Sequence, residues 1–594
     1  MDYPILEGGS RQRQWTQEFL GLDRRPRTND GAFADTENLT GDQWPVVRTR
    51  DKRGTVAELD SPKALQNLNG LSWVDGTTLY YKGVAVKTGL SSGQKQLITF
   101  GAYLIVLPDG VYYNTVDSTD QGSVNRLYQS PAGQNVTFSP CTMDGIDFPT
   151  GSWTASDTPP ANPSSGDYWI NTSSKPHGLY QYSGLTEDWV GIVSVFIKIA
   201  ADGIGEGLNV EDAVTVSGIS VPTAGTKKDQ LEILNETHVI QAVDDDYIVV
   251  IGIVDEVYTY SGRIRADRQM PELDFVFECN NRLWGCRYGK QNGETVNRLY
   301  ATALGDFKNW RKFYGTSQDS YYVNVGTEGP FTGGIAHRGY PYFFKQNCVH
   351  KIYGDRPSNF EMQTTLCDGV KLGCERTLTS ANGVLYYISN HGPVYFESMP
   401  ALCGEALNRR DLENGAAGYS GGEWYLSAQE PDGTWSLYVY DTARGIWYRQ
   451  DNSRALSFAA FGDELYMLDV SGKLLSMHGR AGDAETGRIA WRLESAVMGL
   501  ETPDHKYISR FTIRTRLEDD GECAISMQYD QDGIWHYQGM LHAAGKTRTY
   551  LMPIVPRRCE TAQIRLEGKG KFTLFGIARD LTPGSDANNR EARA

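Results

Sequence analysis

The chain has 594 residues, of which 40% are hydrophobic and 22% charged, an ordinary balance that excludes a disordered or fibrous protein. Because a single hydrophobic core rarely serves a chain of this length, we expect about three or four domains. The formal net charge of −16 argues against a protein that grips nucleic acid through a basic surface. An acidic wall would instead let a polyanion slide past without sticking.

Turn-forming and aromatic residues are abundant: the chain contains 64 Gly, 24 Pro, 34 Tyr and 13 Trp. Gly and Pro favour turns, while Tyr and Trp favour short strands. Long helical patterns are scarce, and the best short candidates lie around residues 60–69 and 405–414. The composition therefore predicts an all-β fold.

The chain has no segment typical of membrane insertion or export. No apolar run approaches the ~18 residues of a membrane-spanning helix, and residues 1–10 lack the basic start and apolar stretch of a signal peptide. We therefore expect no membrane insertion, and synthesis and assembly in the host cytoplasm. The nine Cys are widely spread without a C-x-x-C pair, which favours reduced thiols.

The first 54 residues are polar and contain few strand-like runs, which predicts an extended N-terminal arm. Two apolar clusters interrupt this polarity, one formed by Trp15, Phe19 and Leu20 and the other by residues 44–47. Such clusters can anchor an arm on a neighbouring subunit. They can equally pack on the domain to which they belong.

A short phrase recurs beyond residue 66, consisting of an apolar strand, a turn with Gly or Asn, and a second strand rich in Tyr or Phe. Its copies lie at 71–84, 99–113, 275–288, 334–353, 378–398, 416–447 and 457–477. Outside one long interruption the copies are spaced by roughly 40–50 residues, which is typical of β-propeller blades with about four strands each. No blade motif such as Trp-Asp is present, so an array of two-sheet sandwiches remains the alternative.

The interruption, at residues 130–265, predicts an inserted β module, most economically placed in a blade loop. A Pro-, Ser- and Thr-rich linker at 152–165 leads into it. The candidate binding residues of this module are Trp153, Trp169, Tyr180, Tyr182 and Trp189. Flat aromatic faces can stack on sugar rings, but a small β module also needs Trp and Tyr for its own core, so both interpretations stay open.

The last part of the chain alternates polar and apolar residues again. Seven short strand-like segments are predicted at 489–495, 506–516, 523–529, 535–540, 547–552, 563–567 and 571–578. Their spacing favours a β-sandwich of jelly-roll or immunoglobulin type. The polar end is predicted to be disordered or threaded into a neighbour.

The predicted fold is therefore an all-β chain, a β-propeller with an inserted small β module and a C-terminal β-sandwich. The predicted parts are an extended arm at 1–54, a propeller at 55–129 and 266–480, an insertion at 130–265, a sandwich at 481–580 and a flexible tail at 581–594.

We found no motif for catalysis or for a cofactor. Residues 432–435 match only the end of a sialidase Asp-box and are typical of a plain hairpin turn. Neither a Gly-x-Ser-x-Gly elbow nor a phosphate-binding Gly loop is present. The pair Cys348 and His350 and the acidic turn at 244–246 are the nearest approaches to a metal site, and both lack metal-ligand spacing. The sequence predicts no catalytic residue, no cofactor and no metal, and hence no enzyme.

Several segments resemble the β-propeller proteins of tailed-bacteriophage tail nozzles and necks, of the DNA-stabilisation type. They lie at 274–285, 297–305, 309–310, 329–333, 343–345 and 349–354, in the arm at 37–40 and 44–50, and near the end at 553–559 and 568–570. These are packing and turn motifs, so the resemblance assigns no functional residue. It extends over the arm, the propeller and the C-terminal domain but not over the insertion.

The resemblance implies a structural protein of the virion, located in the tail or neck. Its partners would be other copies of itself in a sixfold ring, the portal or its adaptor, and other tail proteins. Genomic DNA would pass through the lumen without specific binding, and the ring would help to retain and eject the genome. An alternative function is binding to host-surface glycans through the inserted module, and a third is glycosidase activity.

Overall fold

The computed structural model describes residues 11–223, 226–291, 293–408, 411–500, 505–518, 520–554 and 557–583. Nearly all regular structure in these ranges is β, with one short α-helix, α1 (Thr226–Leu234). No helix in these ranges is long and apolar enough to cross a membrane. The chain divides into two compact units: Met1–Lys95 with Phe343–His350 and Thr364–Ala594, and Gln96–Tyr342 with Lys351–Gln363.

The predicted propeller blades are present, and each recurrent phrase lies in a different sheet. In the described part of the chain six of these sheets have four strands and one has five, and within each the strands pair mainly in chain order. The expected short helix near residues 60–69 is instead strand β7. Its Leu65 and neighbouring Ala64 are buried, so the segment carries an apolar pair of a blade and not a helical stripe.

The second unit contains the blades β11–β14, β27–β30 and β31–β34. Their strands are β11 (Gln96–Phe100), β12 (Tyr103–Leu107), β13 (Val111–Asn114), β14 (Gln121–Ser123), β27 (Phe275–Cys279), β28 (Arg282–Gln291), β29 (Glu294–Ala301), β30 (Tyr321–Asn324), β31 (Phe331–His337), β32 (Tyr340–Lys345), β33 (Cys348–Tyr353) and β34 (Glu361–Leu366). Strand β27 contacts both β11 and β31, so the first strands of successive blades lie side by side, as in a propeller. The division between the units passes through the last of these sheets.

The first unit contains the other four blades. Their strands are β7 (Pro62–Asn67), β8 (Leu71–Asp75), β9 (Thr78–Tyr81), β10 (Val84–Lys87), β35 (Thr379–Ala381), β36 (Val384–Ser389), β37 (Gly392–Phe396), β38 (Pro400–Leu402), β39 (Glu413–Ser420), β40 (Glu423–Gln429), β41 (Trp435–Asp441), β42 (Ile446–Asp451), β43 (Ala455–Phe461), β44 (Glu464–Asp469) and β45 (Lys473–Ser476). The last blade is completed by β6 (Gly54–Glu58), which pairs with β45 and with the short β46 (Asp483–Ala484). A strand from the start of the propeller therefore closes its last blade.

The insertion lies in the connection between two blades, after β14 and before β27, and not in a loop within a blade as expected. One sheet has the order β23 (Ala242–Asp244), β24 (Tyr247–Ile251), β20 (Phe196–Ala200), β15 (Val136–Cys141), β25 (Tyr258–Tyr260), and a second has the order β22 (Thr237–Val239), β21 (Ala213–Ser217), β26 (Arg265–Asp267). The chain leaves and returns side by side, because Arg126 bridges to Arg268. Buried Arg268 is also ion-paired with buried Asp212, which accepts a hydrogen bond from Asn309 at 3.0 Å.

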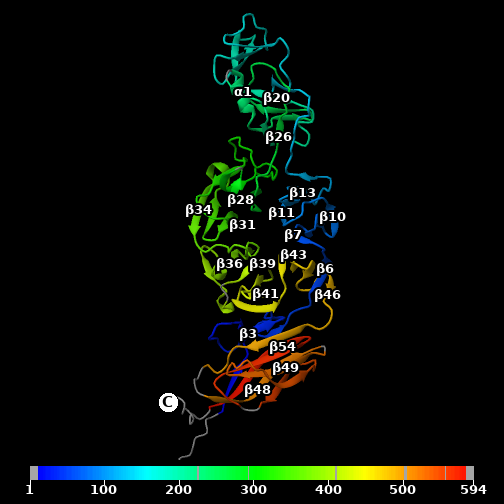
Figure 1. Cartoon of the computed structure of the whole chain (residues 1–594), viewed down its shortest axis with the longest axis vertical. Helices are drawn as coiled ribbons and strands as arrows, with labels where there is room; N and C mark the ends of the chain where they lie inside the picture. The colour runs from blue at the N-terminus through cyan, green and yellow to red at the C-terminus, as the bar shows by residue number, and fades with distance from the viewer. Residues whose placement is uncertain are drawn as a thin grey trace, which may run out of the picture. The chain divides into compact units, whose positions relative to one another are not determined.

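The C-terminal domain is a β-sandwich, and it contains the N-terminal strands. One sheet has the order β4 (Leu39–Thr40), β5 (Val47–Thr49), β54 (Phe572–Pro583), β48 (Lys506–Leu517), β51 (Arg548–Pro553), with β1 (Gln12–Thr16) on β54 and β52 (Arg558–Cys559) on β48. The other has the order β2 (Gly21–Leu22), β3 (Ala32–Glu37), β47 (Ala490–Ser495), β53 (Ala562–Lys569), β49 (Glu522–Tyr529), β50 (His536–His542). Trp491 and Phe572 stack between the sheets with ring centroids 3.9 Å apart. Figure 1 shows the blue strand β3 beside the orange and red strands β54, β48 and β49.

The prediction of an extended arm at residues 1–54 is wrong for the residues described. Phe19 and Val47 are 1% and 0% exposed in the sandwich core, while Trp15 and Trp44 remain about 40% exposed. The apolar clusters thus pack on the chain's own domain. The segment appears polar because its strands are short and several lie at sheet edges, where one face meets solvent. Residues 581–583 of the predicted tail belong to β54, and 584–594 lie outside the described residues.

An ion-pair cluster joins the sandwich to the blade β39–β42. Arg449 of β42 binds both carboxylate oxygens of Asp35 at 3.0 Å, and Arg24 and Arg492 bind the same carboxylate at 3.1 and 2.9 Å. Thr36 hydrogen-bonds the backbone of Arg449 in both directions. Burial opposes the charge on Asp35, but the hydrogen bonds and charge of Arg449, followed by the charges of Arg24 and Arg492, outweigh it and lower its pKa.

We predict that Asp35→Asn lowers the free energy of unfolding by about 1–3 kcal/mol at neutral pH, because it leaves largely buried guanidinium groups without a counter-charge. A carboxyl whose pKa is lower in the folded chain stabilises it above the unfolded pKa of about 4 and loses this effect as the pH falls through the folded pKa. The difference between wild type and variant should therefore shrink in acid. Urea unfolding at pH 7 and below pH 4 measures it, with exposed Asp411→Asn as the control. Equal losses in both variants would contradict the role of the cluster.

Candidate functional site: an aromatic face on the inserted module

A four-stranded sheet within the insertion carries the aromatic residues that the sequence singles out. Its strands are β16 (Trp153–Ser156), β17 (Tyr168–Asn171), β18 (Gly178–Ser183) and β19 (Asp188–Ile192), paired in that order. Strands β16 and β17 run parallel, and the other two pairs are antiparallel. Because side chains alternate along a strand, the register divides the aromatic residues between two faces.

One face forms the small hydrophobic core of this sheet. Ile170 and Leu179 are 0% and 6% exposed and pack with Phe148. The ring of Phe148 stacks on that of Tyr168 with centroids 4.0 Å apart. Trp153 lies opposite Tyr168 in the β16–β17 register and packs against the same core. The structure thus places Trp153, one of the five candidate binding residues, on the core face and away from the other four.

The other face brings together the remaining four candidates. Trp169 lies opposite Tyr180, and Tyr182 lies opposite Trp189. The rings of Trp169 and Tyr180 stack at 4.9 Å, whereas Trp189 contacts Trp169 and Tyr182 edge-on at 5.7 and 5.4 Å. These contacts make one continuous aromatic face, formed by Trp169, Tyr180, Tyr182 and Trp189.

The burial of these rings is uneven. Trp169 is 6% exposed, and its indole N–H donates to the carbonyl of Ser156 at 3.0 Å, so it is a fixed support for its neighbours. Tyr180, Tyr182 and Trp189 are half-buried and keep surface available for a ligand. Gly178 is needed beneath Tyr180, because a Cβ there would lie 2.9 Å from the ring.

This arrangement is suited to binding flat, partly apolar molecules. Aromatic rings present large rigid surfaces at low cost in conformational entropy, and Tyr and Trp add a hydrogen-bonding group at the edge. Exposed Thr154, opposite Trp169 in the register, adds a hydroxyl to the same face. Sugar rings, with apolar C–H faces and hydroxyl edges, match this combination.

The other chemical candidates have structural roles in the described residues. Sγ of Cys348 lies 3.6 Å from Nε2 of His350 inside a blade, and burial lowers the pKa of His350 to about 4. The acidic turn is held by its own hydrogen bonds, since Asp246 accepts from the Gly203 N–H at 2.8 Å. No group of three or more metal-ligating side chains occurs among the described residues.

A polar pocket in the first unit holds acid–base groups that the sequence did not indicate. It has a volume of about 500 Å³ and lies at hairpins of the blades β39–β42 and β43–β45 with β6. The Tyr425 hydroxyl donates to Glu423 at 2.7 Å and lies 3.2 Å from Nε2 of His478. Nδ1 of His478 lies 3.1 Å from Glu464. No motif marks this chain of groups, because its members come from separate hairpins more than 50 residues apart along the sequence.

The two carboxyls of this chain have opposite electrostatic environments. Burial raises the pKa of Glu423, although the Tyr425 hydrogen bond and the charge of His478 oppose the shift. Burial also opposes the charge on Glu464, but the backbone N–H and the charge of His478 outweigh it and lower the pKa of Glu464. Two carboxyls with pKa values pushed apart are typical of acid–base pairs.

No family model and no curated protein matches the chain. Among solved structures it is similar to an exo-β-1,3-galactanase from Phanerochaete chrysosporium, at 9% identity and TM-score 0.20, over 51% of this chain and 94% of that one. It is also similar to a sialidase from Trypanosoma rangeli, at 10% identity and TM-score 0.20, over 90% and 96%. The WD40 domain of SCAP from fission yeast matches at 8% identity and TM-score 0.18, over 93% and 98%.

These neighbours contradict the expectation that the chain is not an enzyme, since the galactanase and the sialidase are enzymes, and we withdraw it. At such low identities and TM-scores the likeness assigns no reaction or substrate to this chain.

We predict that Glu423→Gln removes a pH-dependent loss of stability. A carboxyl with a raised folded pKa contributes stability below its unfolded pKa, about 4, and loses it as the pH rises through the folded value. The variant should therefore gain stability relative to wild type between pH 4 and pH 8. Urea midpoints across this range test it, with exposed Glu58→Gln as the control. A difference that does not change with pH would contradict the raised pKa.

Proposed function

We propose that this chain is a structural subunit of a tailed-phage tail or neck, in which copies form a ring around the path of the genome. The observation that carries the proposal is the resemblance of its segments to tail-nozzle and neck propeller proteins. Those segments fall on consecutive elements of the fold, namely strands β27–β29, β31–β33, β3–β5 and β51–β53. The resemblance thus follows blades and sandwich strands, which are the parts that an architectural subunit needs.

The pairing of the N-terminal and C-terminal segments supports this proposal. The arm-like residues 44–50 include β5, which pairs with β54 near the end of the chain. Two stretches that separately resemble the same proteins therefore belong to one domain. The net charge of −16 also fits a wall that repels phosphates and lets DNA move.

The partners in this proposal are other copies in a sixfold ring, the portal or its adaptor, and further tail proteins. Genomic DNA passes through the lumen without specific binding.

We predict that the chain is a stoichiometric component of purified virions. Mass spectrometry of gradient-purified particles measures its copy number, and electron microscopy of the same particles locates its density below the portal. Particles assembled without the chain should fail to retain their genome. Finding the chain only in the infected cell and never in particles would contradict the proposal.

Glycan binding through the insertion is a second candidate function, favoured by one specific observation. Trp169, Tyr180, Tyr182 and Trp189 form a continuous face on the side of their sheet opposite its core. A sheet of this size needs only one apolar face to fold, so a second aromatic face has no requirement in the core. In a virion such a face would serve attachment to the host surface.

We predict that the whole chain binds host-surface glycans on an array and that Trp189→Ala weakens this binding by about tenfold, since a ring contact contributes roughly 1 kcal/mol. Trp44→Ala, which removes a tryptophan of the sandwich that is 38% exposed, is the matched control. Circular dichroism shows whether both variants remain folded. Equal glycan binding by the two folded variants would exclude the aromatic face as the site.

A further inference from the structure

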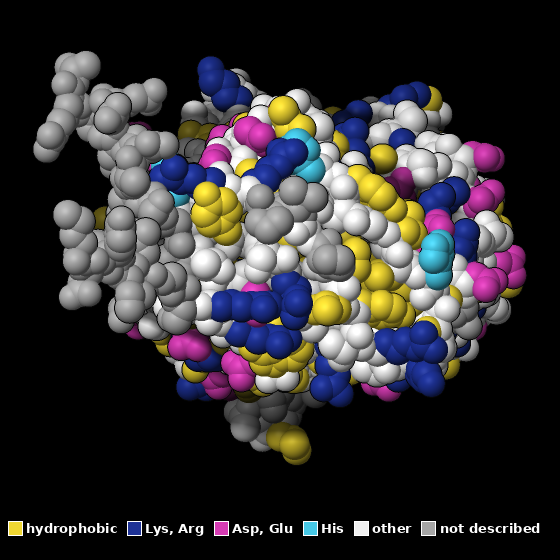
Figure 2. All heavy atoms as spheres, turned by 90° about the horizontal axis from the view of Figure 1, so that it is seen from below, with side chains coloured by type: hydrophobic (Ala, Val, Ile, Leu, Met, Phe, Trp, Pro, Cys, Tyr) yellow, Lys and Arg dark blue, Asp and Glu magenta, His cyan; other side chains and the backbone are white. Residues whose placement is uncertain are grey.

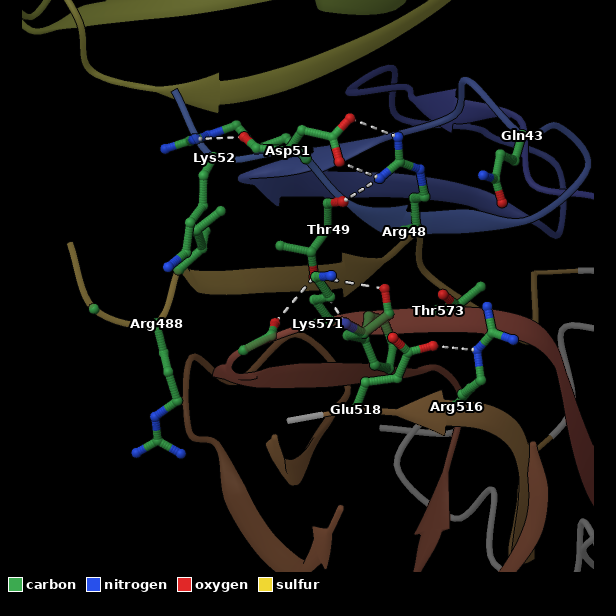
Figure 3. Close-up of a pocket in the computed structure, with 15 residues that line it drawn as sticks. Gln43, Arg48, Thr49, Asp51, Lys52, Arg488, Arg516, Glu518, Lys571 and Thr573 are labelled. Atoms are coloured by element: carbon green, nitrogen blue, oxygen red, sulfur yellow. Dashed lines mark hydrogen bonds and ion pairs between the residues drawn. The ribbon is translucent and has the colours of Figure 1, made fainter. Parts of the chain in front are cut away.

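A cationic pocket lies in the sandwich of the first unit, separate from the aromatic face. It has a volume of about 290 Å³ and is formed by four stretches of chain, at 43–52, 487–489, 516–518 and 570–573. In Figure 3, Lys52 and Arg488 lie on one side, Arg516 and Glu518 on the other, with Thr49 and Lys571 between them. Strand pairing thus brings together side chains that are up to about 500 residues apart in the sequence.

The charges of this pocket oppose the charge of the chain. Six cationic side chains line it, Arg48, Arg50, Lys52, Arg488, Arg516 and Lys571, against the two acidic side chains Asp51 and Glu518. The whole chain carries a net charge of −16. A surplus of cations at one pocket of an acidic protein is therefore a local feature that composition does not require.

Ion pairs within the protein neutralise only part of this surplus. Arg48 binds Asp42 and Asp51, Arg50 binds Glu485, and Arg516 binds Glu518 at 2.8 Å. With Asp42 and Glu485 counted as outside partners, six cations still face four carboxylates.

Two of the cations have no acidic partner among the described residues. Lys52 is exposed and has no such partner. Arg488 is also exposed and donates only to the backbone carbonyl of Asp520, at 2.6 Å. These two side chains are the ones available to an anion.

The floor of the pocket is rigid. Thr49 is 4% exposed, and its hydroxyl accepts from the Phe572 N–H at 3.1 Å and contacts the Gly570 carbonyl at 3.3 Å. Gly487 has a φ of +80°, and a Cβ there would meet no atom within 4 Å, so its backbone faces open space. The cations are thus held around a preformed hollow, which lowers the entropic cost of binding.

Further arginines extend from the pocket over the neighbouring strands. Arg514 and Arg516 belong to β48, and Arg548 lies on the paired strand β51 opposite Thr515. Arg514 and Arg548 are exposed. The view from below in Figure 2 shows groups of Lys and Arg side chains across this end of the first unit, next to hydrophobic side chains.

We propose that this pocket binds a phosphate group, with Lys52 and Arg488 as the binding cations and Arg516 as a third. A phosphate presents two charges and several acceptor oxygens, which Arg and Lys side chains engage through charge-assisted hydrogen bonds. Its source is either a free phosphate compound or the backbone of a nucleic acid, and the row of arginines leading away along β48 and β51 suits the latter. This inference does not depend on the proposed place in a virion, because binding is a property of the purified chain.

The test uses the purified full chain with inorganic phosphate in calorimetry and labelled oligothymidylate in fluorescence polarisation. We expect the double variant Lys52→Ala/Arg488→Ala to bind the effective probe about tenfold more weakly, since two charge-assisted contacts are lost. The control is Arg27→Ala/Lys473→Ala, which removes the same two side-chain types at exposed positions that do not line the pocket. Its affinity should match that of wild type.

Glu518→Gln gives an effect of opposite sign. It removes a carboxylate from the pocket and releases Arg516 from its ion pair, so phosphate affinity should rise several-fold. A charge-neutral change that merely disturbed folding would lower the affinity instead.

The two sources of phosphate give different outcomes. Binding of inorganic phosphate that oligothymidylate does not compete for assigns the pocket to a small phosphate compound. Competition by oligothymidylate, with a salt dependence that weakens in the double variant by about one to two contacts, assigns it to a nucleic acid backbone. The proposal is overturned if neither probe binds, if the double variant and its control bind equally, if Glu518→Gln binds more weakly, or if oligoglutamate binds in preference to both probes.

Discussion

Strand pairing between the two ends of the chain is the constraint on which the first unit depends. Strand β6 completes the blade whose other strands are β43–β45, and β3 and β5 pair with β47 and β54 of the sandwich. None of these sheets can close before the last hundred or so residues exist. Contacts so distant in sequence fold slowly, because the entropy of closing a long loop must be overcome before they form. They also leave no N-terminal segment of the described chain independent of the rest.

The Asp35 cluster shows how this constraint is used. Arg24 and Asp35 come from the N-terminal strands, Arg449 from a blade and Arg492 from the sandwich, so one carboxylate links three parts of the first unit. Two-point binding by Arg449 fixes direction as well as distance. The residues that made this segment look like a solvated arm are therefore the ones that fasten it.

The blades and the sandwich strands were predictable because their signals are local. Asn280 and Asn281 sit at positive φ in a hairpin turn, and the alternation from residue 489 onward coincides with strands β47–β54. The N-terminal strands were not predictable, because β2, β4 and β5 have only two or three residues each. So short a strand has no period to detect, and it forms only against a partner supplied by distant sequence.

The candidate site shows the same limit at the level of single residues. All five aromatic candidates were identified by type, yet assigning them to faces needs the register, since one step along a strand reverses the side chain. The parallel pairing of β16 with β17 sets Trp153 beside Tyr168 on the core face and leaves Trp169 on the other. The polar pocket with Glu423 and His478 gave no signal, because blade packing alone brings its members together.

Charge gives the sharpest example of what a sum over the sequence hides. A net charge of −16 argues against gripping nucleic acid, but that argument applies to the average surface and not to each part of it. Within about one Debye length, roughly 10 Å at moderate ionic strength, an anion responds only to nearby charges. At the pocket between β5, β48 and β54 those are mostly Lys and Arg, gathered from four separate stretches by the same end-to-end pairing that builds the sandwich. One acidic chain can thus present a repelling surface over most of its area and an attracting pocket at a defined place.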